Sequence, residues 1–486
     1  MLTIPITPSV EFDAALVRRL TQAGPRYTSY PSADRFQSGF GEADYRSGVA
    51  ARRAGAEAGA GAGAGAGQAR GLSLYVHIPF CQSLCYYCGC NKIITQDRSK
   101  AVQYLDYLER EIELQGALFA GMNRVEQLHF GGGTPTYLDD AQMDGLLASL
   151  RSRFAFAADE EGEFSVEIDP RTVTPERMHV LRRQGFNRVS LGIQDFDPAV
   201  QRAVNRVQPY EQTAAVLAAA RDAAFRSVSV DLIYGLPCQS PASMAVTLEQ
   251  VIGLKPDRLA LYNYAHMPHL FKSQGLIDAA TLPDPETKLT MLALCIERLT
   301  AAGYVYIGMD HFALPEDDLA RSQREGRLHR NFQGYSTHAE SDLVALGVSA
   351  ISSVGGCYSQ NEKSISAYYA ALDAGRLPVA RGVTLDVDDH LRRSVIGKLM
   401  CDFELDFASL DASQPAIPGG AAAYFAPELE RLRPLEQQGL LRMDSAGIQV
   451  TLRGRLLIRN ICMAFDRYLH AQADTGPPPR RYSATI

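Results

Sequence analysis

The stretch LYVHIPFCQSLCYYCGCN, residues 74–91, holds four of the nine cysteines of this 486-residue chain within ten positions. An even distribution would place about 0.2 cysteines in a window of that length. Cys81, Cys85 and Cys88 form a Cys-x3-Cys-x2-Cys motif, and Cys90 follows two residues later. Thiolates this close in sequence can converge on one inorganic centre. Three of them can hold three irons of a [4Fe-4S] cluster and leave the fourth iron open for a substrate.

A disulfide and a structural zinc site are the competing assignments for these cysteines. A disulfide is disfavoured, because the first residues, MLTIPITPSVEFDAALVRR, have neither the basic start nor the apolar core of a secretory signal. Structural zinc usually takes two separated ligand pairs, and the chain has no second pair with the usual spacing. We therefore expect an iron-sulfur cluster, and we expect Cys90 not to be one of its ligands.

Outward from the cysteines, short β-rich runs alternate with helical patterns. The spacing of Ala101, Leu105, Leu108 and Ile112 predicts a helix with one apolar face. Strand and helix repeated six or more times predict parallel pairing and an α/β fold, a complete or partial (β/α) barrel. The predicted strands are residues 74–78, 127–130, 164–168, 188–193, 227–234, 258–264 and 304–309.

Active sites of such barrels lie at the C-terminal ends of the strands, so the residues after each run are the candidates for function. GGGTPT, residues 131–136, follows the second run and can bring its backbone close to a ligand, although a tight turn is the simpler interpretation. Glu167 ends the third run, where it could bind a ribose or pair with a helix arginine. His266 and His311 follow later strands and are weak candidates for metal ligands.

The flanking regions differ in character from the barrel. GPRYTSYPSADRF, residues 24–36, has no helical or strand period and by itself predicts a surface arm, and the Gly/Ala tract at 54–67 predicts a flexible linker. Residues 364–467 are mainly helical in pattern, and 435–461 predict a winged-helix-like unit of helix, hairpin and helix. We expect an N-terminal arm with linker at 1–70, a barrel at 71–350 and a C-terminal helical domain at 351–486.

Composition excludes several classes of function. A net charge of −7 disfavours a nucleic-acid binder, and no run approaches the roughly 18 apolar residues of a membrane span. These features predict a cytoplasmic protein. We expect a monomer.

The cysteine motif, with Tyr87 directly before its third cysteine, is similar to that of the radical S-adenosylmethionine (SAM) enzymes. The wider string HIPFC…LCYYCGCNK, including Cys90, resembles the oxygen-independent coproporphyrinogen III oxidases, and so does HRNFQGYSTH at 329–338. The resemblance extends from about residue 24 to about residue 468. It implies a radical SAM barrel that converts two propionates of coproporphyrinogen III to vinyl groups and yields protoporphyrinogen IX without oxygen. The resemblance also implies that the N-terminal stretch lies near the active site and that the C-terminal region covers the barrel mouth.

The same resemblance implies two cofactors and their sites: a [4Fe-4S] cluster and two molecules of SAM. The cluster ligands would be Cys81, Cys85 and Cys88, and no catalytic residue is assigned beyond the residues that hold the cofactors. The cofactor-binding residues would be Tyr75, Tyr87, Gly132, Gly133, Thr134 and Glu167, with Gln194, Arg206, Asp231, Ala265 and Ile351 at the second SAM.

Two alternatives to the oxidase stay open at this point. A radical SAM haem chaperone would keep the cofactors and lack the reaction, although Cys90 and the GPRYTSYP segment favour the oxidase. A zinc-organised winged-helix regulator would differ in its metal. The electron donor and the electron acceptor of the oxidase are not identifiable from the sequence.

Overall fold

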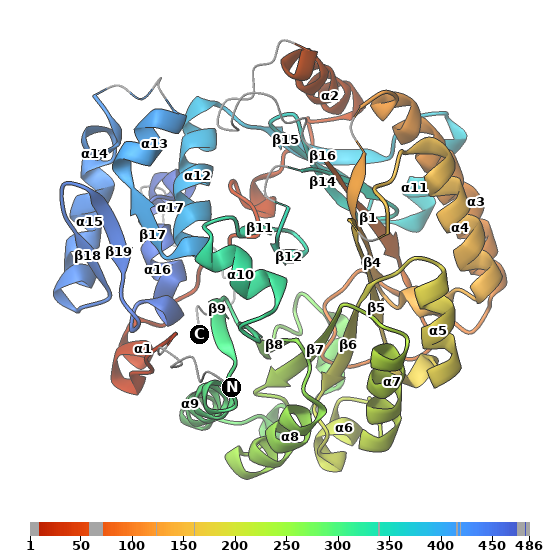
Figure 1. The fold of residues 1–486 in the computed structure, drawn as a ribbon, viewed down its shortest axis with the longest axis horizontal. Coiled ribbons are helices and arrows are strands. Elements are labelled where there is room, and N and C mark those ends of the chain that lie inside the picture. The colour runs from red at the N-terminus through yellow and green to blue at the C-terminus, as the bar shows by residue number, and fades with distance from the viewer. Residues whose placement is uncertain are drawn as a thin grey trace.

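A twelve-stranded sheet is the centre of the computed structural model, which describes residues 9–57, 71–122, 124–159, 161–338, 341–414, 417, 419–473 and 482. Its strand order is β16-β15-β14-β13-β1-β4-β5-β6-β7-β8-β10-β9. Strands β1 and β4 to β8 are parallel to one another, and helices cover their outer side (Figure 1). This arrangement confirms the predicted α/β class and the partial barrel.

The predicted strands and helices lie close to their expected positions. The parallel strands are Leu72–Ile78 (β1), Val125–Gly132 (β4), Glu163–Ile168 (β5), Arg188–Gln194 (β6), Ser227–Tyr234 (β7) and Arg258–Asn263 (β8). The helices are Ser99–Phe119 (α3), Asp140–Arg153 (α4), Pro175–Arg183 (α5), Pro198–Ala203 (α6), Tyr210–Asp222 (α7), Pro241–Leu254 (α8) and Pro285–Ala301 (α9). The short 3-10 turns are Pro135–Tyr137 (η2), Pro170–Thr172 (η3), Lys272–Leu276 (η4) and Ala279–Thr281 (η5).

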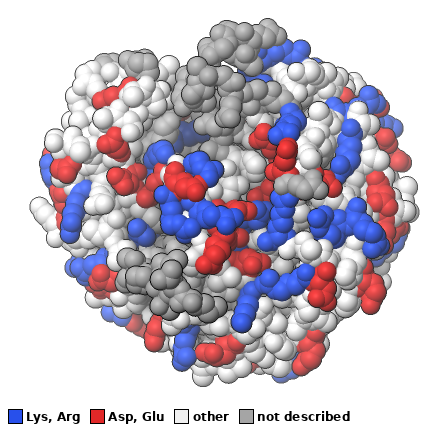
Figure 2. All heavy atoms as spheres, in the orientation of Figure 1, with Lys and Arg blue, Asp and Glu red and all other residues white. Residues whose placement is uncertain are grey.

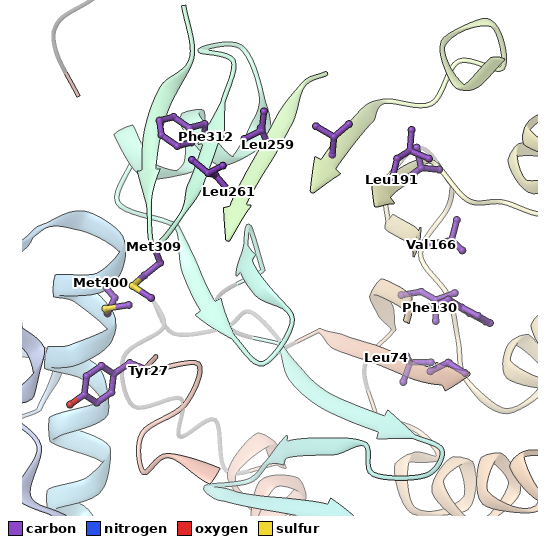
Figure 3. Close-up of a cluster of buried hydrophobic side chains, with 14 of the residues drawn as sticks. Tyr27, Leu74, Phe130, Val166, Leu191, Leu259, Leu261, Met309, Phe312 and Met400 are labelled. Atoms are coloured by element: carbon purple, nitrogen blue, oxygen red, sulfur yellow. The ribbon is translucent and has the colours of Figure 1, made fainter. Parts of the chain in front are cut away.

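Side chains of the parallel strands alternate between an apolar outer layer and a polar interior, because successive residues of a strand face opposite sides of the sheet. Figure 3 draws Leu74, Phe130, Val166 and Leu191 from four neighbouring strands as one row of buried apolar side chains. The intervening residues line a cavity of about 160 Å³ inside the barrel. Those from β4 to β8 include His129, Glu163, Ser165, Glu167, Arg188, Ser190, Ser227, Ser229, Asp231, Arg258, Ala260 and Tyr262.

The seventh predicted strand is present but is not the direct neighbour of the sixth. Val305–Gly308 (β9) and His311–Ala313 (β10) form a hairpin, and β10 lies antiparallel between β8 and β9. The parallel barrel therefore ends at β8, because the chain turns back on itself after β9.

At its other edge the sheet continues beyond residue 350, where the sequence predicted the barrel to end. Asp342–Leu346 (β13) pairs parallel with β1, and three antiparallel strands follow it. They are Ile351–Val354 (β14), Cys357–Asn361 (β15) and Val379–Thr384 (β16), with helix Ile365–Asp373 (α11) before the last. We propose that the unit containing the sheet extends to residue 384.

Charged residues close the barrel at the N-terminal ends of its strands. Arg188 pairs with Glu163 at 3.0 Å, and Arg258 pairs with Asp317, the N-cap of helix Asp318–Arg324 (α10), at 2.8 Å. Side chains of both charges gather across the middle of the face in Figure 2. The hairpin His329–Asn331 (β11) and Gly334–Ser336 (β12) lies at the centre of Figure 1, between the sheet and the C-terminal helices.

The N-terminal segment is not a surface arm. Tyr27, Tyr30 and Phe36 are buried, and the Tyr27 hydroxyl donates a hydrogen bond to Asp466 at 3.1 Å. The apolar area of the aromatic rings stabilises this packing, which the missing period could not reveal. The flanking elements are Ala14–Leu20 (α1), Ala33–Arg35 (η1) and Glu42–Glu57 (α2). Helix α2 thus includes the start of the Gly/Ala tract, and residues 58–67 of the tract lie outside the described residues.

The C-terminal region is helical with a small sheet, as predicted. Its helices are Val387–Asp402 (α12), Phe407–Ser413 (α13), Ala421–Tyr424 (α14), Ala426–Gln437 (α15), Arg455–Leu457 (η6), Ile458–Met463 (α16) and Arg467–Ala473 (α17). Its strands are Glu404–Asp406 (β17), Leu441–Met443 (β18) and Gly447–Val450 (β19). The order α15, β18, β19, α16 gives the expected helix, hairpin and helix. Within the described part of the chain, no helix has the length and apolar character that crossing a membrane requires.

Candidate functional site

The cysteines lie on a loop that follows β1 and is anchored at both ends. Phe80–Cys81 (β2) pairs with Ile93–Ile94 (β3), and the Thr95 amide donates to the Cys81 carbonyl at 3.0 Å. Inside the loop, the Cys88 carbonyl accepts hydrogen bonds from Lys92 Nζ (2.9 Å) and Ser273 Oγ (3.1 Å). These contacts hold the loop at the C-terminal end of the first barrel strand, where the barrel architecture predicts the active site.

Two arginines direct N–H groups at the sulfur of Cys85. Arg171 Nη2 lies 3.5 Å and Arg206 Nη1 lies 3.6 Å from Cys85 Sγ. The same two guanidinium groups pair with Asp169, at 2.7 Å and 3.1 Å, and Arg206 also donates to the Gly192 carbonyl at 2.7 Å. The carboxylate thus fixes both donors beside the thiol. Such outer contacts orient a ligand and, in iron-sulfur sites, tune the potential of the cluster.

The other thiols of the loop have different surroundings. A hydrogen bond with Cys90 lowers the pKa of Cys88 to about 6, and the nearby ammonium of Lys92 acts in the same direction. Burial raises the pKa of Cys81 to about 11. Cys90 therefore has a described contact with a predicted ligand, which agrees with a supporting role for this residue.

The described residues include no group of three His, Cys, Asp or Glu side chains that converge on one metal ion. Thiols around a single zinc ion lie within about 4 Å of one another, since each is about 2.3 Å from the metal. A cube of four irons holds its ligands further apart and needs more room. Three free thiols on one loop, with cationic donors beside the buried one, fit a larger inorganic group of this kind.

The glycine-rich loop after β4 packs directly against the cysteine loop. A Cβ atom on Gly133 would lie 2.7 Å from the Pro79 carbonyl oxygen, so only glycine allows this approach. The amides of Gly133 and Thr134 donate to the carbonyls of Ile78 (2.8 Å) and Phe80 (2.9 Å). These two amides are therefore used within the protein, where they join the glycine loop to the segment that begins the cysteine loop.

Glu167 lies at the end of β5 beside the glycine loop. Its carboxylate contacts His129 Nε2 at 3.0 Å and accepts from the Gly132 amide at 3.3 Å, so its partner is a strand histidine rather than a helix arginine. The His129 ring stacks on Tyr75 with centroids 5.8 Å apart. Tyr75 donates in turn to His77 Nδ1 at 3.1 Å. The glycine loop, Glu167 and Tyr75 are thus brought together.

Asp231, on β7, lines the same cavity as Glu167. Burial and the neighbouring Glu167 raise the pKa of Asp231 to about 7, and a hydrogen bond from Ser190 at 3.5 Å offsets part of that rise. Gln194, one strand away, has a φ of +68° at a shift in the pairing of β6 with β7. A non-glycine residue in this conformation is strained, which is common at functional sites.

The raised pKa of Asp231 makes a prediction about stability. The folded protein holds this proton up to about pH 7, whereas the unfolded chain releases it near pH 3.8, so wild-type stability falls as the pH rises through this range. Between pH 5 and pH 8, we expect the free energy of unfolding of the wild type, measured with urea, to fall by about 2 kcal/mol more than that of Asp231→Asn. Asp106→Asn, at an exposed position on α3, should follow the wild-type curve. Parallel curves for wild type and Asp231→Asn would contradict the assignment.

The remaining predicted residues are more dispersed. Tyr87 packs against a buried cluster that includes Val200 and Val204. Ala265 follows β8, whereas Ile351 begins β14 and packs near Phe36, and six of the described strands lie between β14 and β8 in the sheet order. The structure therefore places these two residues on different elements of the chain.

Several residues of the site were missed by sequence reasoning, among them His77, His129, Asp169 and Arg171. The polar members of β4 and β5 recur at every second position, as in Glu163, Ser165 and Glu167. That alternation is the signal that could have found His129, because it marks a polar interior. Asp169 and Arg171 had no such signal, since they follow the strand in an irregular turn.

Two known protein families and several curated relatives match this chain. Residues 75–251 match the Radical SAM superfamily, and residues 385–457 match the HemN C-terminal domain. The chain is 50% identical to the oxygen-independent coproporphyrinogen III oxidase of Escherichia coli over 96% of its length and 97% of the relative. It is also 50% identical to that of Pseudomonas aeruginosa, over 95% and 97%, and 44% identical to that of Synechocystis, over 95% and 96%.

A solved structure supports the same family. The coproporphyrinogen III oxidase of Escherichia coli, described as a radical SAM enzyme, superimposes with a TM-score of 0.87 at 49% identity and covers 95% of this chain and 100% of its own. The predicted resemblance is confirmed, and the haem chaperone and the zinc regulator are not favoured. With this identity over nearly the whole of both chains, the protein belongs to the oxygen-independent coproporphyrinogen III oxidase family of radical SAM enzymes.

Proposed function

We propose that this chain carries out its family's reaction with a [4Fe-4S] cluster held by Cys81, Cys85 and Cys88. The observation that supports this most strongly is the position of the cysteine loop. It follows the first barrel strand, and the glycine loop and Glu167 border it. Held there, the cluster and SAM would supply the chemistry of a 5′-deoxyadenosyl radical for hydrogen abstraction from a propionate of coproporphyrinogen III.

The protein's own contribution is to position the cofactors and to keep other C–H groups away. Glu167, fixed by His129, would accept hydrogen bonds from a ribose at the edge of the cavity. Gly132 and Gly133 let this loop pack against His77 and the Pro79 carbonyl, and their backbone would border a ligand beside the cysteines. Thr134, whose hydroxyl lies 3.5 Å from Cys81 Sγ, would border the same ligand. Tyr75 and Tyr87 would complete the walls of this site.

A second SAM would lie further along the strand ends, near Gln194, Arg206 and Asp231, with Ala265 and Ile351 at its margins. A substrate that loses two carboxyl groups suits two such molecules. Anaerobic equilibrium binding to the reconstituted protein should give about two SAM per cluster. A value of one, with full cluster occupancy, would contradict the second site.

The proposal as a whole is tested by anaerobic turnover with coproporphyrinogen III, SAM and a reductant. We expect protoporphyrinogen IX and 5′-deoxyadenosine, and the reaction should proceed without oxygen. A chaperone of the same superfamily would bind haem and form no vinyl product, so haem binding without turnover would overturn the proposal.

The setting of the reaction is also a proposal. We propose a monomer working in the cytoplasm, where thiols stay reduced, and the free thiols of all nine cysteines support that compartment. An electron donor must reduce the cluster and an acceptor must take the electron left on the substrate. Neither is identified by the chemistry of the described residues.

A further inference from the structure

Arg330, on the hairpin strand β11, differs from the other deeply buried arginines of the described chain. Four arginines are more than nine-tenths buried, namely Arg188, Arg206, Arg330 and Arg459. Three of them reach a carboxylate or a carbonyl: Arg188 pairs with Glu163, Arg206 with Asp169, and Arg459 donates to Pro25. Arg330 is 8% exposed, and its Nε and Nη1 atoms have no hydrogen-bond partner within the described residues.

An unpaired guanidinium is costly to bury, because the lost hydration is not replaced. Arg330 is partly compensated by the ring of Tyr335, whose centroid lies 4.8 Å from its guanidinium carbon. Tyr335 is fixed by a hydrogen bond from its hydroxyl to the Met400 carbonyl at 3.0 Å. This contact holds the guanidinium in place and leaves its Nε and Nη1 donors without partners within the described residues.

The guanidinium stacks on a ring, that of Tyr335, which belongs to the wall of the barrel cavity. Tyr335 and His311 both line that cavity, together with Glu167 and Asp231 at the strand ends. Burial and then the charge of Arg330 lower the pKa of His311 to about 4, so the histidine is neutral and cannot compete for an anion. The cavity holds only part of a tetrapyrrole, and a side-chain carboxylate is a group of suitable size.

The surrounding charges favour an anion. Asp310 is already paired with Arg26, which lies beside Tyr262. The charges of Arg26 and Arg330 both act to lower the pKa of Arg459, after the larger effect of burial. These arginines supply local positive charge in a chain whose net charge is −7.

We propose that Arg330 binds a propionate carboxylate of the tetrapyrrole substrate at the rim of the barrel cavity. The family's substrate carries four propionates, and a guanidinium with free donors is a suitable partner for a carboxylate. The carboxylate of SAM has the same chemistry. We assign the site to the substrate because Arg330 belongs to the β11–β12 hairpin, whereas the residues proposed for SAM are chiefly at the ends of the parallel strands.

The test measures binding of coproporphyrin III, the stable oxidised form of the substrate, to the reconstituted protein without oxygen. Arg330→Gln should weaken binding about 10- to 100-fold. Arg324→Gln removes the same charge from an exposed position on α10 and should bind as the wild type does. The tetramethyl ester of coproporphyrin III has no free carboxylates, so wild type and Arg330→Gln should bind it equally.

Three results would overturn the proposal. They are an unchanged affinity in Arg330→Gln, an equal loss for the acid and the ester, and a loss of SAM binding with coproporphyrin III binding intact. Arg330→Lys keeps the positive charge but lacks the planar guanidinium, so its affinity for coproporphyrin III should fall about 3- to 10-fold. This variant provides the test if Arg330→Gln fails to fold. Unchanged affinity in the lysine variant would then overturn the assignment. Cluster content and SAM cleavage without substrate, measured on each variant, separate this site from the proposed cofactor sites.

Discussion

Cys85→Ser is expected to give a protein that binds little iron and neither cleaves SAM nor converts coproporphyrinogen III. Cys85 is the buried member of the three predicted ligands, and Arg171 and Arg206 both direct donors at its sulfur. A serine hydroxyl is a much poorer ligand for iron than a thiolate, and two remaining thiolates would leave two irons open. Iron and sulfide analysis, visible absorption and 5′-deoxyadenosine formation under anaerobic conditions are the measurements.

Cys90→Ser is the matched control, because it changes the same atom five residues away on the same loop. Cys90 lowers the pKa of Cys88, and we predict that it is not a ligand. This variant should keep about four irons and four sulfides per chain. Loss of iron from Cys90→Ser, or a full cluster in Cys85→Ser, would contradict the three-cysteine assignment.

Arg206→Met should lower activity at least about 100-fold and destabilise the fold by about 3 kcal/mol. The guanidinium is 7% exposed and joins Asp169, the Gly192 carbonyl and the Cys85 sulfur. Its removal leaves Asp169 buried with Arg171 as its remaining arginine partner. The measurements are SAM affinity, steady-state turnover and urea unfolding.

Arg202→Met tests whether the effect belongs to that position. Arg202 lies one turn earlier, and its side chain is exposed. Its replacement should change stability by less than about 0.5 kcal/mol and leave SAM affinity unchanged. If both variants lose activity equally, the general loss of positive charge is responsible rather than the contacts of Arg206.

The parallel barrel could be predicted from the sequence because each strand is short, apolar on one face and followed by a clear turn. Thr174, for example, caps α5 by accepting from the Arg177 amide, as its position before Pro175 predicts. The β9–β10 hairpin and the added strands β14 to β16 were not predicted, because several of these strands have only three or four residues and show little period. Gly355-Gly356, between β14 and β15, is a hairpin signal that could have found one of them. The packing of Tyr27 and Tyr30 was hidden because their partners lie more than 400 residues further along the chain.

For the site, the cysteine spacing and the strand ends were informative, because ligands of one centre cluster in sequence. Contacts between side chains of different strands and loops could not be predicted from the sequence. His129 and Glu167 meet because β4 and β5 are neighbours in register, and Asp169 meets Arg206 across a further loop. Only the three-dimensional arrangement shows that Arg206 is buried and Arg202 is exposed.

The packing of the first segment against the last has a consequence for synthesis. Tyr27 contacts Asp466, and Pro25 accepts from Arg459, across separations of 439 and 434 residues. During translation the barrel strands emerge long before these partners, so the first aromatic segment lacks its packing surface on the ribosome until the final helices appear. Shortening the chain at its C-terminus would leave the early aromatic segment without the surface that orders it.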